Sequence, residues 1–297
     1  MTTRRRPRGK QLVERPKRAT RKLVCAPGNP ASPGGSCFSE RAIHTIADAW
    51  NLRHPELPKI AGTAGEKRAM LSRAMETHCE HERCWLAKAF GKAGIPRTLS
   101  HYTFAPAAPR SWTNNPREWL DSHDITRVMR QYEKRYPGFV FLGPSPIDFD
   151  KRLAHGTCVW DDLCNFDLRT IARKGKRFVG FIFNLDPHNK GGSHWISMFL
   201  NIPKGYLFAY DSTGDPMPRP VNKLIKRIVS QASAMDIDLD VKRSGRPHQL
   251  KDTECGIYAI HMITSLLAGS ATPATFQKGP LLRDDEVWRL RAKYFNV

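Results

Sequence analysis

The segment FVGFIFNLDPHNKGGSHWISMFLNIPKGYLFAYD, residues 178–211, contains three apolar runs separated by turn-forming residues. The first two runs are joined by a loop rich in Pro, Asn and Gly, and His194 lies where the second run begins. Short apolar runs bounded by such residues predict core strands. The third run ends at Asp211, so the segment predicts neighbouring strands with a histidine at one strand start and a carboxylate at another strand end.

A second segment, HQLKDTECGIYAIHMITSLLAG at residues 248–269, predicts a buried helix. Cys255 begins a continuous apolar stretch, and Gly269 ends it. A thiol at a helix N-terminus meets backbone N–H groups and a partial positive charge, which favour the thiolate. The alternative for Cys255 taken alone is a small buried core thiol.

Four side chains from these segments fit the roles of a cysteine-nucleophile site. Cys255 supplies the thiol, His194 the base, and Asp211 an acceptor that holds the imidazole N–H. Gln249, six residues before Cys255, offers an amide N–H₂ to the oxyanion beside the backbone N–H groups of the helix start. Asp211 also suits a turn, because STGDP follows it, and a loop glutamine by itself means little.

The ordered set resembles the adenain/Ulp1-like superfamily of cysteine proteases, which includes SUMO-specific proteases and the maturation proteases of adenoviruses and large cytoplasmic DNA viruses. The family's His-Trp pair, Asp or Asn, oxyanion Gln and Cys-Gly pair correspond to His194-Trp195, Asp211, Gln249 and Cys255-Gly256. The intervals of 17, 38 and 6 residues agree with the family order. The resemblance implies an α+β fold, with a papain-like Ulp1/adenain-type protease core and a helical N-terminal extension, and it implies no cofactor.

The resemblance also places Trp195 and Gly256 beside the substrate, with core packing as the alternative for Trp195. Gly191 and Gly192 precede the histidine and let a substrate backbone approach, although loop flexibility explains them equally well. Related enzymes favour small, Gly-containing cleavage sequences such as Gly-Gly-X. A narrow cleft that admits only small residues near the scissile bond explains such selectivity.

Composition divides the chain into three predicted parts. Residues 1–35 are rich in Pro, Gly and Arg and predict a disordered basic arm. Residues 36–110 predict a helical N-terminal domain, in which Ile43, Ile46 and Trp50 recur at helical spacing. A Pro-rich linker leads into a catalytic domain at residues 111–297.

Net charge is +20, and residues 1–23 hold ten Lys or Arg against one Glu, a net of +9. This concentration favours nonspecific attraction to DNA or RNA phosphates, and the alternative is a solubilising or nuclear-localisation-like tail. No apolar run approaches the ~18 residues of a membrane span. The N-terminus also lacks the apolar region of a signal peptide.

Seven cysteines at irregular intervals favour a reducing compartment over a disulfide framework. Cys158 and Cys164 are accordingly expected to be buried thiols rather than a redox pair. The cluster His78, Cys79, His81 and Cys84 has zinc-ligand residue types but lacks a second pair at finger spacing, so core packing or an interaction role is expected and no metal is assigned.

Three functions follow from these patterns. The first is a viral maturation protease that cuts structural polyproteins or core proteins, in the virion and host cytoplasm. The second is a protease that removes SUMO or another ubiquitin-like modifier. The third is a nucleic-acid-binding structural protein with a vestigial cysteine site, against which the intact set of four polar residues argues.

Overall fold

The computed structural model describes residues 22–29, 35–91, 94–154 and 156–297 of the chain. The chain divides into two compact units: residues 40–95 belong to one, and residues 24–39 with 96–297 form the other. The predicted basic arm lies largely outside the described residues. The predicted boundary at residue 110 stays a prediction.

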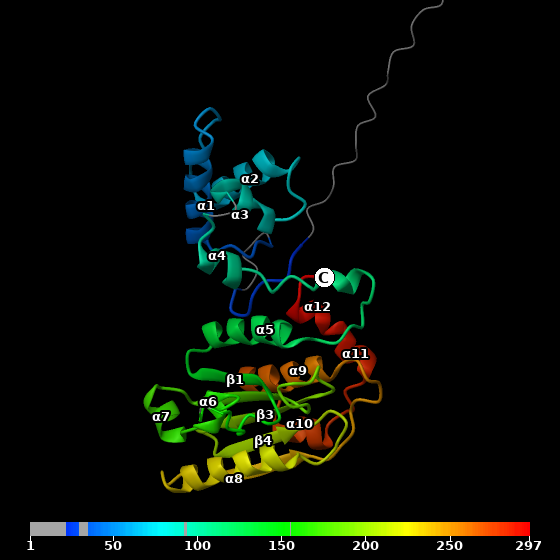
Figure 1. The fold of residues 1–297 in the computed structure, drawn as a ribbon. Coiled ribbons are helices and arrows are strands. Elements are labelled where there is room, and N and C mark those ends of the chain that lie inside the picture. The colour runs from blue at the N-terminus through cyan, green and yellow to red at the C-terminus, as the bar shows by residue number, and fades with distance from the viewer. Residues whose placement is uncertain (1–21, 30–34, 92–93, 155) are drawn as a thin grey trace, which may run out of the picture. The chain divides into compact units, whose positions relative to one another are not determined.

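Within its described residues, the smaller unit contains three helices, α1 (Glu40–Arg53), α2 (Ala64–Met75) and α3 (Arg83–Phe90) (Figure 1). Helix α1 buries the face that its sequence predicts, including Ile43, Ile46 and Trp50. Helix α2 begins with a capping box, in which the side chains of Thr63 and Glu66 each accept a hydrogen bond from the backbone N–H of the other residue. The helical character predicted for this part of the chain is therefore confirmed.

The larger unit is built on a five-stranded sheet with the strand order β1-β2-β3-β4-β5. The strands are β1 (Phe139–Pro146), β2 (Phe178–Asn184), β3 (Trp195–Asn201), β4 (Tyr206–Tyr210) and β5 (Asp240–Ser244). Strand β3 is antiparallel to both of its neighbours, β2 and β4, whereas the edge strands β1 and β5 pair in parallel with β2 and β4, respectively. The three apolar runs of residues 178–211 are therefore the central strands, as their sequence predicts.

Helices cover both faces of this sheet (Figure 1). Helices α5 (Ser122–Arg135) and α9 (Cys255–Ala268) share an apolar core with Phe199 and Phe208 on one face. Helix α8 (Arg219–Ser233) shares a second core with Phe181 and Leu207 on the other face. The remaining helical segments are α4 (Arg97–Tyr102), η1 (Arg110–Thr113), α6 (Asp161–Cys164), α7 (Leu168–Arg173), α10 (Pro273–Lys278), α11 (Asp284–Arg289) and α12 (Arg291–Tyr294). The predicted α+β class is confirmed.

Two local details concern the ends of the helices. Helix α9 ends at Gly269 in the left-handed conformation, as its sequence predicts. Helix α5 is capped by Asp121, whose carboxylate accepts the Asp124 backbone N–H at 2.7 Å. Among the described residues, no helix is long and apolar enough to cross a membrane.

The cysteine pairing differs from the expectation of free thiols. Three disulfides join Cys25 to Cys37, Cys79 to Cys84 and Cys158 to Cys164, and Cys255 alone is free. The expectation that Cys158 and Cys164 are separate buried thiols is wrong. Each pair is separated by 5 to 12 residues along the chain, and turns bring the partners within bonding distance.

Candidate active site

The free thiol of Cys255 lies at the first residue of helix α9. Only 1% of the residue is exposed, and the helix behind it is buried along nearly its whole length. The N–H groups of the first helical turn have no partners within the helix and point towards this end. This end of the helix therefore presents backbone N–H donors beside the sulfur, where negative charge develops during a nucleophilic attack.

His194 directly precedes β3, at the end of the loop that follows β2. The Asn184 carboxamide closes this loop, because its Oδ1 accepts the backbone N–H of Asp186 at 2.9 Å and of Ser193 at 3.3 Å. Gly192 has φ +95°, and a Cβ there would lie 2.5 Å from Asn184 Nδ2. The glycine is thus required by the loop that holds His194, whatever its role towards a substrate.

Asp211 follows the last residue of β4 and is 2% exposed. Its Oδ1 lies 2.8 Å from His194 Nε2, and it also accepts the backbone N–H of Thr213 at 3.0 Å and the Thr213 hydroxyl at 2.8 Å. The same carboxylate therefore organises the turn and orients the imidazole. The two alternative roles that the sequence suggests for Asp211 occur together.

Charge and burial act in opposite directions on His194. Burial lowers the pKa of His194, but side-chain hydrogen bonds to Asp211 and Cys255 outweigh burial and raise the pKa from 6.5 to about 10. For Asp211, burial acts in the opposite sense and raises the pKa, but the contacts with His194 and Thr213 outweigh burial and hold the pKa below its ordinary value. With a pKa of about 10, His194 is an imidazolium at neutral pH, held between the Asp211 carboxylate and the Cys255 side chain.

Gln249 lies six residues before Cys255 and is 5% exposed. Its Oε1 accepts the Ser212 hydroxyl at 2.7 Å, and its Nε2 donates to the Lys251 carbonyl. The backbone N–H of Gln249 also donates to the Ser212 carbonyl at 2.8 Å. With its oxygen fixed, the amide keeps a second N–H that no protein acceptor within the described residues takes up. Ser212 was not among the predicted site residues, because a serine in a turn carries no distinguishing signal.

Trp195 and Gly256, the two predicted substrate-binding residues, both contact Leu120. The Trp195 indole N–H donates to the Leu120 carbonyl at 2.9 Å. A Cβ on Gly256 would lie 3.0 Å from Leu120 Cβ, so Gly256 gives Leu120 room to pack at the start of α9. Trp195 thus combines packing with a place in the wall of an adjoining cleft.

This cleft has a volume of about 500 Å³. It is lined by Trp195, by Gly191 and Gly192, and by Trp119, which is 40% exposed. Trp119 was not singled out from the sequence, since an isolated tryptophan before a helix is more often a core residue. The cleft adjoins the loop of His194 and offers flat aromatic walls with glycine backbone between them.

No metal site accompanies these residues. The described part of the chain contains no group of three or more His, Cys, Asp or Glu side chains that could hold a metal ion. In the cluster at residues 78–84, the Cys79–Cys84 disulfide occupies both thiols.

Residues 173–296 match the Ulp1 protease family, C-terminal catalytic domain, a span that contains all six predicted site residues. A putative thiol protease of Acanthamoeba polyphaga mimivirus is 30% identical over 168 residues, which cover 56% of this chain and 52% of that protein. The chain thus spans about half the length of this relative. The SUMO-1 cysteine protease of African swine fever virus is 22% identical over 255 residues, covering 78% of this chain and 88% of that protein.

The fold is shared more widely than the sequence. The crystal structure of an African swine fever virus protease matches with a TM-score of 0.63 at 18% identity, over 95% of this chain and 98% of that chain. At that identity the likeness shows the fold alone. The predicted resemblance in fold and family is confirmed.

Proposed function

We propose that this chain, whose residues 173–296 match the Ulp1 protease family, is an endopeptidase that cleaves viral structural polyproteins or core proteins at Gly-containing sites during virion maturation. The observation that carries the proposal is the hydrogen bond from His194 to Asp211 together with the interaction of His194 with Cys255, the one free cysteine among the described residues. The relatives named above come from large DNA viruses, which supports the viral setting. We accordingly place the protein in the virion and the host cytoplasm.

The reaction follows from the geometry of the site. The Cys255 thiolate attacks the scissile carbonyl carbon, and the oxygen gains negative charge as the tetrahedral intermediate forms. The second N–H of Gln249 and the Cys255 backbone N–H donate to that oxygen. The imidazolium of His194 then protonates the leaving amine as the C–N bond breaks, which leaves a thioester on Cys255.

Hydrolysis of the thioester uses the same groups in reverse. Neutral His194 accepts a proton from water as the water oxygen attacks the thioester carbonyl. A second tetrahedral intermediate collapses and expels the thiolate, which restores the paired His194 and Cys255. Asp211 holds the imidazole by its Nε2 atom throughout, which leaves Nδ1 as the ring nitrogen that exchanges protons in the reaction.

The cleft beside His194 supports a preference for small residues near the scissile bond. Trp119 and Trp195 offer flat walls, and glycines at 191 and 192 present backbone without side chains. Such a surface suits an extended substrate backbone that carries little bulk. The Gly-containing sites in the proposal rest on this shape and on the family resemblance.

A second candidate is removal of a ubiquitin-like modifier, and one comparison favours it. The African swine fever virus relative, of which this chain covers 88%, carries the name SUMO-1 cysteine protease. Attraction of nucleic acid by the basic arm stays a prediction, since residues 1–21 lie outside the described structure.

The test compares the wild type with Cys255→Ala and His194→Ala on two kinds of substrate. The first is a fluorogenic peptide that contains Gly-Gly-X, and the second is a SUMO-amide conjugate. Peptide cleavage that both substitutions abolish is expected. Cleavage confined to the SUMO conjugate would replace maturation by deconjugation, and turnover that survives Cys255→Ala would refute the cysteine mechanism.

A further inference from the structure

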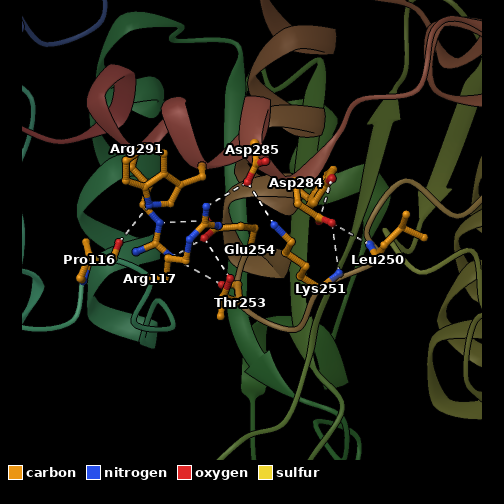
Figure 2. A network of polar contacts seen from close by, with 11 residues as sticks. Pro116, Arg117, Leu250, Lys251, Thr253, Glu254, Asp284, Asp285 and Arg291 are labelled. Atoms are coloured by element: carbon orange, nitrogen blue, oxygen red, sulfur yellow. Dashed lines mark hydrogen bonds and ion pairs between the residues drawn. The ribbon is translucent and has the colours of Figure 1, made fainter.

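The structure assigns Asp284, a residue of helix α11, as a positioning residue for the oxyanion donor Gln249; this inference rests on the proposed function. Figure 2 shows Asp284 facing the backbone of Leu250 and Lys251, with Glu254 and Arg291 in the same network. The loop at residues 249–254 joins Gln249 to Cys255, so its shape sets where the amide donor lies relative to the sulfur.

Asp284 holds this loop by its backbone. One carboxylate oxygen, Oδ2, accepts the N–H of Leu250 at 3.0 Å and the N–H of Lys251 at 3.1 Å. The residue is 6% exposed, so water competes little for these bonds. Two charge-assisted bonds to consecutive amides fix the chain direction at this point. The Leu250 side chain, by contrast, is largely exposed and contributes little to the anchoring.

The loop passes this restraint to the Gln249 side chain. The Lys251 carbonyl accepts a hydrogen bond from Gln249 Nε2, while Ser212 holds the opposite end of the carboxamide. If residue 251 moves, the amide loses the acceptor that orients its N–H groups. Asp284 thus acts through Lys251 on the atom that is proposed to stabilise the oxyanion.

The other Asp284 oxygen belongs to a second set of contacts. Oδ1 lies 3.2 Å from the Tyr258 hydroxyl, which also lies 3.2 Å from the His248 carbonyl and 2.8 Å from the Leu282 carbonyl. Burial and nearby charge raise the pKa of Tyr258, so it stays a neutral donor. His248 Nδ1 accepts the Leu282 N–H at 3.1 Å. The residue that precedes Gln249 is therefore held by the same C-terminal segment.

A neighbouring carboxylate provides the matched control. Asp285 binds the Lys251 ammonium at 3.2 Å and Arg117 at 2.9 Å, and its side chain is 61% exposed. It contacts the same loop residue, but by a flexible side chain in solvent and not by the backbone. A surface pair of this kind is worth little. If the network acts only as general surface charge, the two aspartates are equivalent.

The experiment measures peptide hydrolysis and Cys255 alkylation by iodoacetamide in the full chain. Alkylation requires the thiolate but no oxyanion donor, so it separates the nucleophile from Gln249. For Asp284→Ala we expect kcat to fall about 10- to 100-fold, somewhat less than the 10²–10³ typical of deleting a donor. We expect KM and the alkylation rate to stay within about threefold of the wild type, and Asp285→Ala to behave like the wild type.

Two further variants show whether Asp284 acts through Gln249. Asp284→Asn keeps an acceptor for both amides and a donor for the Tyr258 oxygen, so it is expected to recover most of the kcat. In a Gln249→Ala background, Asp284→Ala is expected to cause no further loss. If Asp284→Ala fails to fold, Asp284→Ser takes its place, because its hydroxyl is too short to reach both amides.

Several outcomes would overturn the inference. Equal kcat in the wild type and Asp284→Ala would do so, as would an undiminished loss in the Gln249→Ala background. A parallel fall in the alkylation rate would show that Asp284 supports the whole site and not the donor. Absence of Cys255-dependent turnover in the wild type would refute the proposed function itself, and the inference with it.

Discussion

Replacing Asp211 by Asn separates two contributions of the carboxylate to His194, orientation and charge. Oδ1 of Asp211 accepts hydrogen bonds from His194 Nε2 and from the Thr213 backbone N–H and hydroxyl. The side-chain oxygen of Asn can accept the same three bonds, so we expect it to occupy the same position. The variant therefore keeps the orientation of the imidazole and loses the negative charge. Asp211→Ala loses both.

The magnitude follows from the pKa of His194. Its rise from 6.5 to about 10 corresponds to roughly 5 kcal/mol in favour of the imidazolium, shared between the contacts with Asp211 and Cys255 after burial has been overcome. If the charge of Asp211 supplies a third to a half of this, Asp211→Asn lowers the pKa of His194 by about 1 to 2. The imidazolium then persists only to about pH 8 to 9.

The sign of the pH effect is fixed by the direction of the shift. The folded pKa lies above the unfolded value, so the stabilising interaction is complete below pH 6.5 and is lost as pH rises through about 10. The alkaline limb of kcat/KM in the wild type is thus expected near pH 10, and in Asp211→Asn at lower pH. At pH 7 we expect Asn to lower kcat/KM less than about tenfold, and Ala to lower it by about 100-fold.

The assay is a profile of kcat/KM from pH 6 to 10.5 on a Gly-Gly-X peptide, with unfolding in urea as a control for stability. An Asp211→Asn profile whose alkaline limb coincides with that of the wild type would refute the argument from charge. Equal activities of the Asn and Ala variants at pH 7 would refute the argument from orientation.

Three further predictions concern the surroundings of the nucleophile. Gly256→Ala places a Cβ 3.0 Å from Leu120. We therefore expect the free energy of unfolding in urea to fall by about 1–2 kcal/mol, although Ala has the better helix propensity. A gain in stability would contradict the packing argument. Arg291→Met leaves Glu254, which is fully buried, without its ion-pair partner, so we expect the free energy of unfolding to fall by about 3–5 kcal/mol. Adding Glu254→Gln to this variant removes the buried charge and is expected to restore most of that stability. Alkylation of the native, unreduced protein is expected to modify Cys255 alone by mass spectrometry, whereas several modified cysteines would contradict the disulfide pairing.

The parts of the fold that the sequence predicts are those with a local cause. The apolar runs of residues 178–211 become strands because turn residues bound each run, and the stretch from Cys255 becomes a helix because Gly269 ends it. The contact between His194 and Asp211 could also be predicted from the sequence, because the candidate roles of both residues follow from their positions at strand ends. Their catalytic roles, with those of Gln249 and Cys255, stay proposals.

The contacts that the sequence did not predict join residues without a distinctive local pattern. Ser212 bonds Gln249 across 37 residues, and Asp284 bonds Leu250 across 34, yet a serine in a turn and an aspartate at a helix start are ordinary in any sequence. The disulfides were missed for a related reason. Irregular cysteine intervals say nothing about Cα separations of 5.2 to 6.2 Å, which only the folded backbone sets.

The interval between the site residues along the chain follows from how the strands of the sheet pair. Strands β3 and β4 are antiparallel, and Ser197 pairs with Tyr210. The start of one strand therefore lies beside the end of the other, and the interval of 17 residues between His194 and Asp211 is the length of two strands and their hairpin. Helix α9 packs against β3, and this packing fixes the position of its first residue, Cys255, relative to the sheet. The Gln249 loop is held from two sides, by Ser212 just after the end of β4 and by Asp284 of the C-terminal segment, so its position depends on both.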